Sequence, residues 1–91
     1  MTVRIIIPTV LRRSTGGQSE IRLSGSNLGE CIDRMEAKFP GIKDRLCDEA
    51  GEIRRFVNIY VNGEDVRFIA GKDTAVKPGD EISIVPAVAG G

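Results

Sequence analysis

The chain has 91 residues, 41% of them hydrophobic, and its 13 Lys and Arg are balanced by 13 Asp and Glu. This length suits one small domain whose apolar residues nearly all serve a single core. A net charge of zero supplies no basic field for nucleic acid or a membrane surface, and no apolar run approaches the ~20 residues that span a bilayer. The opening residues do not resemble a signal peptide, so we expect a reduced, cytoplasmic protein that binds neither nucleic acid nor membrane.

The beginning of the chain predicts two strands joined by a turn. Residues 2–7 are rich in β-branched side chains, and residues 18–24 alternate apolar and polar side chains. Pro8 lacks a backbone donor and ends the first strand, and residues 14–17 tolerate the positive φ of a turn. We therefore expect an antiparallel hairpin with one solvated face.

A helix is predicted to follow this hairpin. Asn27 stands three residues before Glu30, which is the spacing of a capping box with Asn in place of Ser or Thr. Apolar residues then recur at helical spacing and form one stripe: Leu28, Cys31, Ile32, Met35 and Phe39. Pro40-Gly41 should end the helix, and residues 42–46 predict one further short helical turn.

The second half of the chain predicts a return to the sheet. Residues 55–62 alternate as a strand and end in the turn-forming pair Asn62-Gly63. Residues 65–69 predict a short edge strand, and residues 77–80 a turn with Pro and Gly at its centre. Residues 81–85 supply the last strand.

This order predicts an α+β fold, and the β-grasp (ubiquitin-like) roll fits it best, with a mixed sheet of four to five strands and one main helix packed on one face. The first and last strands should lie side by side in parallel at the centre. We expect a domain over residues 1–86 and an extended tail over residues 87–91. The predicted core consists of Val3, Ile5, Ile21, Leu28, Ile32, Met35, Val57, Ile59, Ile82 and Ile84.

The side chains predict no catalytic centre. The chain has no His, its carboxylates alternate with basic residues as on a solvated surface, and its serines have no base to activate them. Cys31 lies on the apolar helix stripe, and Cys47 is expected to be partly exposed. Two thiols without His are too few ligands for a zinc site or an iron–sulfur cluster, and no glycine segment has the spacing of a phosphate loop. We therefore expect no enzyme and no bound cofactor or metal.

The end of the chain is the most informative segment. With glycine at ~7% of positions, a terminal Gly-Gly pair arises by chance about once in two hundred sequences. After Pro86 the side chains are small, so the tail should thread a narrow channel in a partner, and two glycines let an enzyme close tightly around the final carboxylate. We predict that chemistry is done to Gly91, with the channel occupied by Ala87, Val88, Ala89 and Gly90.

Several segments carry long motifs that match one known family: IPTVLR at 7–12, TGGQ at 15–18, LG at 28–29, RFVNIYVN at 55–62, EDVRF at 64–68 and PAVAGG at 86–91. With these motifs the whole chain resembles the ubiquitin-like sulfur carriers that end in Gly-Gly, and it is most similar to those of cysteine biosynthesis. The thiamine carriers are shorter, and the molybdopterin synthase small subunits usually have a second proline where this chain has Ala87.

The resemblance implies a mechanism. An adenylating and sulfurtransferase enzyme of the ubiquitin-activating type would use ATP to adenylate the carboxylate of Gly91, and sulfide or a persulfide would convert it to a thiocarboxylate. A pyridoxal phosphate-dependent cysteine synthase would then accept the sulfur, and a zinc peptidase of the JAB/MPN type would release cysteine. ATP, pyridoxal phosphate and zinc would all belong to these partner enzymes.

Two alternatives stay open. In the first, the protein is a carrier that donates its sulfur to molybdopterin, thiamine or a secondary metabolite. In the second, the activated Gly91 is joined to other proteins, as ubiquitin is. For partner binding we predict the helix-free face of the sheet, because family members use their sheet face for partners; its residues are Ile6, Pro8, Tyr60 and Val85. The basic pairs Arg12-Arg13 and Arg54-Arg55 are typical of a solvated surface and form the alternative interface if that face does not bind.

Overall fold

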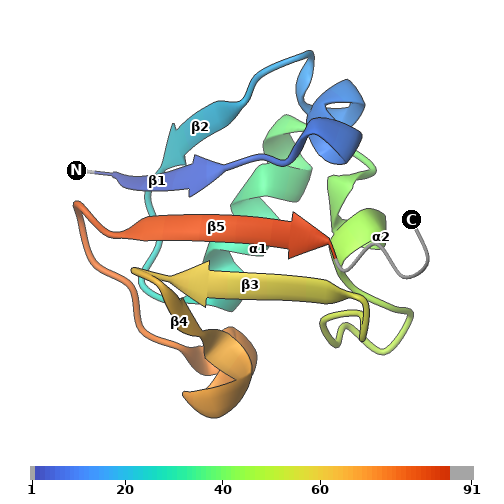
Figure 1. Cartoon of the computed structure of the whole chain (residues 1–91). Helices are drawn as coiled ribbons and strands as arrows, with labels where there is room; N and C mark the ends of the chain where they lie inside the picture. The colour runs from blue at the N-terminus through green and yellow to red at the C-terminus, as the bar shows by residue number, and fades with distance from the viewer. Residues whose placement is uncertain (1, 87–91) are drawn as a thin grey trace.

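The computed structural model describes residues 2–86, so Met1 and the predicted tail 87–91 lie outside the described residues. Within that range, a five-stranded mixed sheet in the order β2-β1-β5-β3-β4 carries α1 across one face (Figure 1). The strands are β1 (Val3–Ile6), β2 (Glu20–Leu23), β3 (Val57–Val61), β4 (Glu64–Asp65) and β5 (Glu81–Pro86). The helical segments are α1 (Leu28–Lys38), α2 (Ile42–Leu46) and the 3-10 turns η1 (Thr9–Thr15), η2 (Val66–Phe68) and η3 (Gly71–Asp73). The α+β, β-grasp prediction is confirmed.

The parallel pair β1–β5 forms the centre of the sheet, as predicted. Ile5 of β1 lies opposite Ile82 of β5, and β5 pairs on its other side with antiparallel β3, where Ile84 lies opposite Ile59. These side chains point toward α1 and are buried. The two hairpins therefore meet along one strand, and β5 has a hydrogen-bonded neighbour on each side.

All ten residues of the predicted core are buried. They are joined by residues that the alternation did not single out, among them Ile42 and Leu46 of α2 and Val66 of η2. Cys47 is also buried, with only 2% of its surface exposed, so the expectation of partial exposure is wrong. The reason is that α2 packs against the core and turns Cys47, its C-terminal cap, inward with it.

The N-terminus of α1 confirms the predicted cap and modifies it. The Asn27 side chain accepts a hydrogen bond from the Glu30 amide at 2.8 Å. The Glu30 carboxylate accepts from the amide of Ser26 at 2.9 Å, one residue before the position that a capping box uses. Two amide donors at the helix start are thereby satisfied.

A carboxylate also holds the start of α2. Glu36 of α1 accepts hydrogen bonds from the amides of Gly41 and Lys43, with shortest distances of 3.0 and 2.9 Å. These two bonds hold the pKa of the Glu36 carboxyl below its ordinary value, and the bond from the Lys43 amide has the larger effect. The predicted helix end at Pro40-Gly41 is confirmed, and Gly41 makes the reversal with a φ of 103° that favours glycine.

Two segments differ from the sequence prediction. The first hairpin is not a simple turn, because residues 9–15 form η1 and bury Leu11 and Thr15 against the core. Of the predicted edge strand at 65–69, only Asp65 pairs with β3, as the second residue of β4, and the chain then turns into η2. Asp65 causes this change, because its side chain accepts a hydrogen bond from the Arg67 amide at 2.9 Å and caps the 3-10 turn.

A polar cluster fixes the start of β5. Asn62 takes a positive φ of 52° in the β3–β4 turn, which an Asn tolerates. Its side-chain amide donates to Asp80 at 3.0 Å and accepts from the Glu81 amide at 2.9 Å. Asp80 also accepts from the Lys77 amide at 2.9 Å. The bonds from Asn62 and then Lys77 lower the pKa of the Asp80 carboxyl.

We expect Ile32→Ala or Ile59→Ala to lower the free energy of unfolding by ~2–4 kcal/mol, through lost transfer energy and a new cavity. That is a large part of the roughly 5–15 kcal/mol typical of a domain. The denaturant midpoint measures it, and Val10→Ala, at a site that is 62% exposed, is the control and should cost less than ~0.5 kcal/mol. Unchanged midpoints for both core variants would contradict the assigned faces.

Asp80 should make stability fall in acid. Its pKa is lower folded than unfolded, so its contribution is complete above the unfolded value near 3.8 and is lost as pH falls through the folded value. Asp80→Asn should therefore cost about 1 kcal/mol at neutral pH and flatten the acid limb of the stability curve. Urea unfolding across pH measures this. Asp73→Asn, at an exposed carboxylate, is the control, and an unaltered acid limb in Asp80→Asn would contradict the prediction.

Candidate functional site at the end of the central strand

The candidate site begins where β5 ends. Pro86 is the last described residue and lies opposite Val57, the first residue of β3. The segment before β3 is tied to α2, because the Arg54 amide donates to the Leu46 carbonyl at 2.9 Å. In the sequence, Pro86 is followed by the predicted threading residues Ala87, Val88, Ala89 and Gly90 and by the predicted reactive residue Gly91, all outside the described residues. The structure therefore defines the root of the tail, and we call this end of the sheet the tail root.

Three of the four predicted docking residues lie on the helix-free face of the sheet. Ile6 of β1 lies opposite Ser83 of β5, which in turn lies opposite Tyr60 of β3, so the three form one row across the sheet. Ile6 and Tyr60 are half-buried, and Val85, two residues closer to the tail, is 45% exposed. Pro8 is half-buried just beyond the end of β1. Ile6, Tyr60 and Val85 thus lie on the helix-free face, Pro8 follows the end of β1, and contact of the four residues with a partner stays a prediction.

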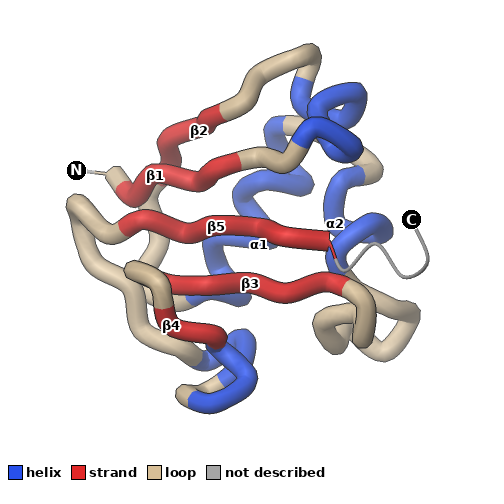
Figure 2. Tube along the Cα trace, in the orientation of Figure 1, coloured by secondary structure: helices blue, strands red, loops and turns tan. Residues whose placement is uncertain are grey.

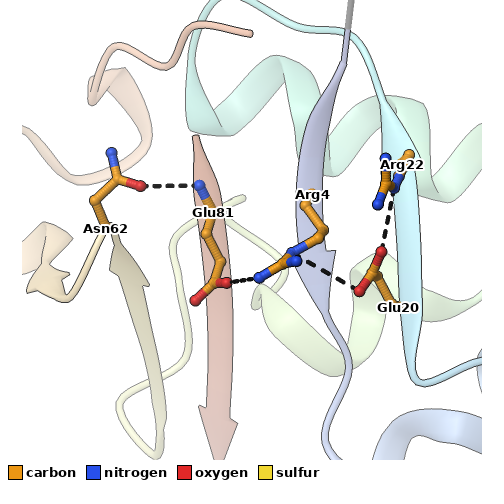
Figure 3. Close-up of polar contacts among 5 residues, drawn as sticks. All are labelled: Arg4, Glu20, Arg22, Asn62 and Glu81. Carbon is orange, nitrogen blue, oxygen red and sulfur yellow. Dashed lines mark hydrogen bonds and ion pairs between the residues drawn. The ribbon is translucent and has the colours of Figure 1, made fainter. Parts of the chain in front are cut away.

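The same face also carries an ionic cluster. Figure 3 shows Arg4 of β1 between Glu81 of β5 and Glu20 of β2, with Arg22 next to Glu20 along β2. The Arg4 guanidinium donates to the Glu81 carboxylate and lies 3.7 Å from the carboxylate of Glu20. Both contacts raise the pKa of Arg4, and the hydrogen bond to Glu81 has the largest effect. On the helix-free face, the Arg4–Glu81 pair thus lies at the start of β5, and the row of Ile6, Ser83 and Tyr60 is flanked by Glu20 of β2 and Asp65 of β4.

Sequence reasoning missed Arg67, which fixes the chain beside the tail root. Its guanidinium donates to the carbonyls of Arg54, Arg55 and Val57 at 2.7–3.1 Å. It also donates to the Asn58 side chain at 2.8 Å. These partners precede Arg67 by 9 to 13 residues, so no local spacing signals the contact. Arg67 holds the start of β3 in place against the last pair of β5.

The described residues carry little reactivity of their own. Burial raises the pKa of the Cys31 thiol to about 11, and burial is likewise the main cause that raises the pKa of Cys47. Both thiols are therefore protonated at neutral pH. Between residues 2 and 86, no group of three or more potential ligands is placed to hold a metal ion. Over the same residues, no helix has the length and apolar character to cross a membrane.

The described residues form a ubiquitin-like β-grasp fold, and the sequence is similar to those of small sulfur carrier proteins. The chain belongs to the ThiS family, whose model matches residues 5–91. It is 53% identical to the sulfur carrier protein CysO of Mycobacterium tuberculosis, over the full length of both chains. It is 36% identical to the small archaeal modifier protein 3 of Haloferax volcanii, over 72% of this chain and 71% of that one.

Solved structures agree with this assignment. A chain in the crystal structure of the Amycolatopsis orientalis BexX/CysO complex superposes with a TM-score of 0.92 and 48% identity. The match covers 98% of this chain and 99% of that chain. The fold of the described residues is therefore that of a sulfur carrier known to form a complex.

Proposed function

We propose that this protein carries sulfur as a thiocarboxylate on Gly91 and supplies it for cysteine synthesis. The observation that carries this proposal is the 53% identity to CysO along the whole chain. The family match also extends through the last residue, and so includes the Gly-Gly pair. The chain is then a co-substrate of other enzymes, in keeping with a family of small carriers.

Activation would proceed in two chemical steps, adenylation and sulfur transfer. The Gly91 carboxylate attacks the α-phosphorus of ATP, so that an acyl–phosphate bond forms and pyrophosphate leaves. A sulfide or persulfide sulfur then attacks the acyl carbon, the bond to AMP breaks, and the sulfur remains on Gly91. When a persulfide is the donor, a reductant must cleave its S–S bond. The thiocarboxylic acid is more acidic than a thiol, so it is an anionic nucleophile at neutral pH without a neighbouring base.

This division of labour assigns the chemistry to partner enzymes. An adenylating enzyme of the ubiquitin-activating type binds ATP, a cysteine synthase with pyridoxal phosphate takes the sulfur, and a zinc peptidase of the JAB/MPN type releases cysteine. This chain contributes a carboxylate and four residues narrow enough for a channel: Ala87, Val88, Ala89 and Gly90. Its folded part serves to present them.

The helix-free face near the tail root is the proposed docking surface. Ile6, Tyr60 and Val85 gather apolar and aromatic groups beside the strand that leads into the tail, and Pro8 borders them. Aromatic and aliphatic side chains at the centre of a contact supply most of its binding energy. A partner seated on this face also lies at the entrance through which the tail must pass.

The second candidate is a protein modifier, favoured by the similarity to a small archaeal modifier protein. In that case the same activated Gly91 acylates the amine of a target lysine. The two functions share adenylation and differ in product. A carrier gives free protein in which one oxygen is exchanged for sulfur, whereas a modifier gives a set of larger conjugates.

Deleting Gly91, or replacing Gly90→Leu, should abolish adenylation because the acyl group is lost or cannot enter a narrow site. Pyrophosphate release with the activating enzyme measures this. The melting temperature should stay close to that of the unaltered chain, because the core is formed by residues 3–84.

Thr2→Ala, an exposed change at the other terminus, is the control and should be adenylated normally. Normal adenylation of the shortened chain would exclude both the carrier and the modifier function. Intact-mass measurement on the unaltered chain after activation with a sulfur source then separates these two functions by their products.

Val85→Asp or Ile6→Asp should weaken binding to the activating enzyme by more than ~1.5 kcal/mol, because a charge replaces an apolar anchor at a desolvated contact. Isothermal titration on protein shown to be folded measures the loss. Phe68→Asp is the matched control, since Phe68 is an apolar residue, 88% exposed, on η2 rather than on this face. Unchanged affinity in both face variants would place the interface elsewhere.

A further inference from the structure

The arginines of this protein divide into two groups by their position. Arg4, Arg22 and Arg34 each lie within 4 Å of a carboxylate. The other six make no such ion pair with any residue from 2 to 86. One of them, Arg67, is engaged in the hydrogen bonds at the start of β3. The remaining five lie on segments at the tail-root end of the sheet: Arg12, Arg13, Arg45, Arg54 and Arg55. We call these five residues the arginine collar.

The fold brings the collar together from three separate segments. Because β1 and β5 are parallel, η1, which follows β1 with Arg12 and Arg13, lies at the same end as Pro86. Because β3 is antiparallel to β5, residues 54–55 enter from that end too. Arg45 lies on α2, which packs against η1 and is bonded to the Arg54 amide. Figure 2 shows these helical and loop segments grouped at the end of β5.

Two collar arginines are held in position but not neutralised. Arg12 donates through Nε to the Ile7 carbonyl at 3.2 Å, and Arg54 donates through Nε to the Asp44 carbonyl at 2.9 Å. Neither bond uses the terminal Nη groups, which are the atoms that form paired hydrogen bonds with carboxylates. Each guanidinium is therefore oriented by the backbone and keeps the fork that a partner would bind.

Carboxylates are also present at this end, but none of those in residues 2–86 forms an ion pair with a collar arginine. Asp48 accepts from the amides of Ala50 and Glu52 at 2.9 and 3.0 Å. The side chains of Asp44, Glu49 and Glu52 are exposed, and none lies within 4 Å of a collar arginine. Lys43, the nearby lysine, pairs with Asp33 at 2.7 Å.

Apolar groups lie within the same surface. Val10 of η1 is 62% exposed and Phe56 is 52% exposed, and the Arg54 guanidinium lies 6.0 Å from the Phe56 ring centroid. Arginine and aromatic residues around aliphatic ones are characteristic of protein interfaces. The tail root therefore has the composition of a contact surface with a basic rim.

We infer that the arginine collar docks against an acidic rim around the channel of the partner protein that receives the tail. This inference rests on the proposed function. Five residues in extended form reach about 17 Å, so a threaded tail places its reacting carboxylate well beyond the collar. The collar then contacts the protein surface at the channel mouth, where carboxylates complement it, rather than the nucleotide.

The test neutralises collar residues that make no side-chain hydrogen bond with the described residues. Arg13→Gln with Arg55→Gln should slow association with a purified ubiquitin-activating-type enzyme about tenfold at low salt, because rim charges act mainly on the association rate. The difference should largely vanish at ~1 M salt. The matched control is Arg34→Gln with Lys38→Gln, which changes the net charge equally on α1 and should slow association less than twofold.

Each outcome has a defined meaning. Equal slowing by both pairs would show an effect of net charge alone and overturn the inference, as would no slowing by the collar pair. Collar-dependent binding of magnesium ATP by the chain without enzyme would overturn it in favour of a phosphate site. At saturating enzyme the collar variant should still be adenylated. If the unaltered protein binds the enzyme through its collar but is never adenylated, that result contradicts the proposed function and leaves the docking inference standing. Absence of binding by the unaltered chain would overturn both.

Discussion

The parallel pairing of β1 with β5 is the constraint on which the rest of the molecule depends. It buries Ile5 beside Ile82 under α1 and gives β5 a hydrogen-bonded neighbour on both sides. The same pairing sends the chain after β1 and the chain after β5 out of one end of the sheet. The tail root, η1 and the start of β3 are brought together for this reason, although they are far apart in sequence. If β5 ran in the opposite direction, the chain after Pro86 would leave from the other end of the sheet, away from η1 and the start of β3.

Much of this architecture was predictable, because period and capping are local properties. Alternation in residues 57–61 and 81–85 identified which side chains meet α1, and Asn27 marked the helix start. The docking face followed from the same alternation, since residues that are not inward must point outward. The inward faces of the strands and of α1 could therefore be predicted from the sequence, whereas the contribution of α2 and η2 to the core could not.

The errors arose where one side chain overrides a regional pattern. Asp65 caps η2 and ends an edge strand that its β-prone neighbours favoured. The expected hairpin loop forms η1 because Leu11 and Thr15 are buried there. Their burial depends on a surface that exists only in the folded state. Arg67 donates to carbonyl groups up to 13 residues away in the sequence, and contacts at this separation produce no periodic pattern of residue types. The reactive tail, in contrast, was inferred from composition and resemblance, and lies outside the described residues.

The two buried thiols have a consequence under the proposed function, in which the Gly91 carboxylate becomes an acyl phosphate. An activated acyl group reacts readily with thiolates, and a cysteine on the surface would capture it as a thioester, either within one molecule or between two. Cys31 and Cys47 are the only cysteines in the chain, and both are enclosed and held protonated. The body of the protein is thus protected from self-acylation, and external sulfur meets no internal competitor for the activated terminus.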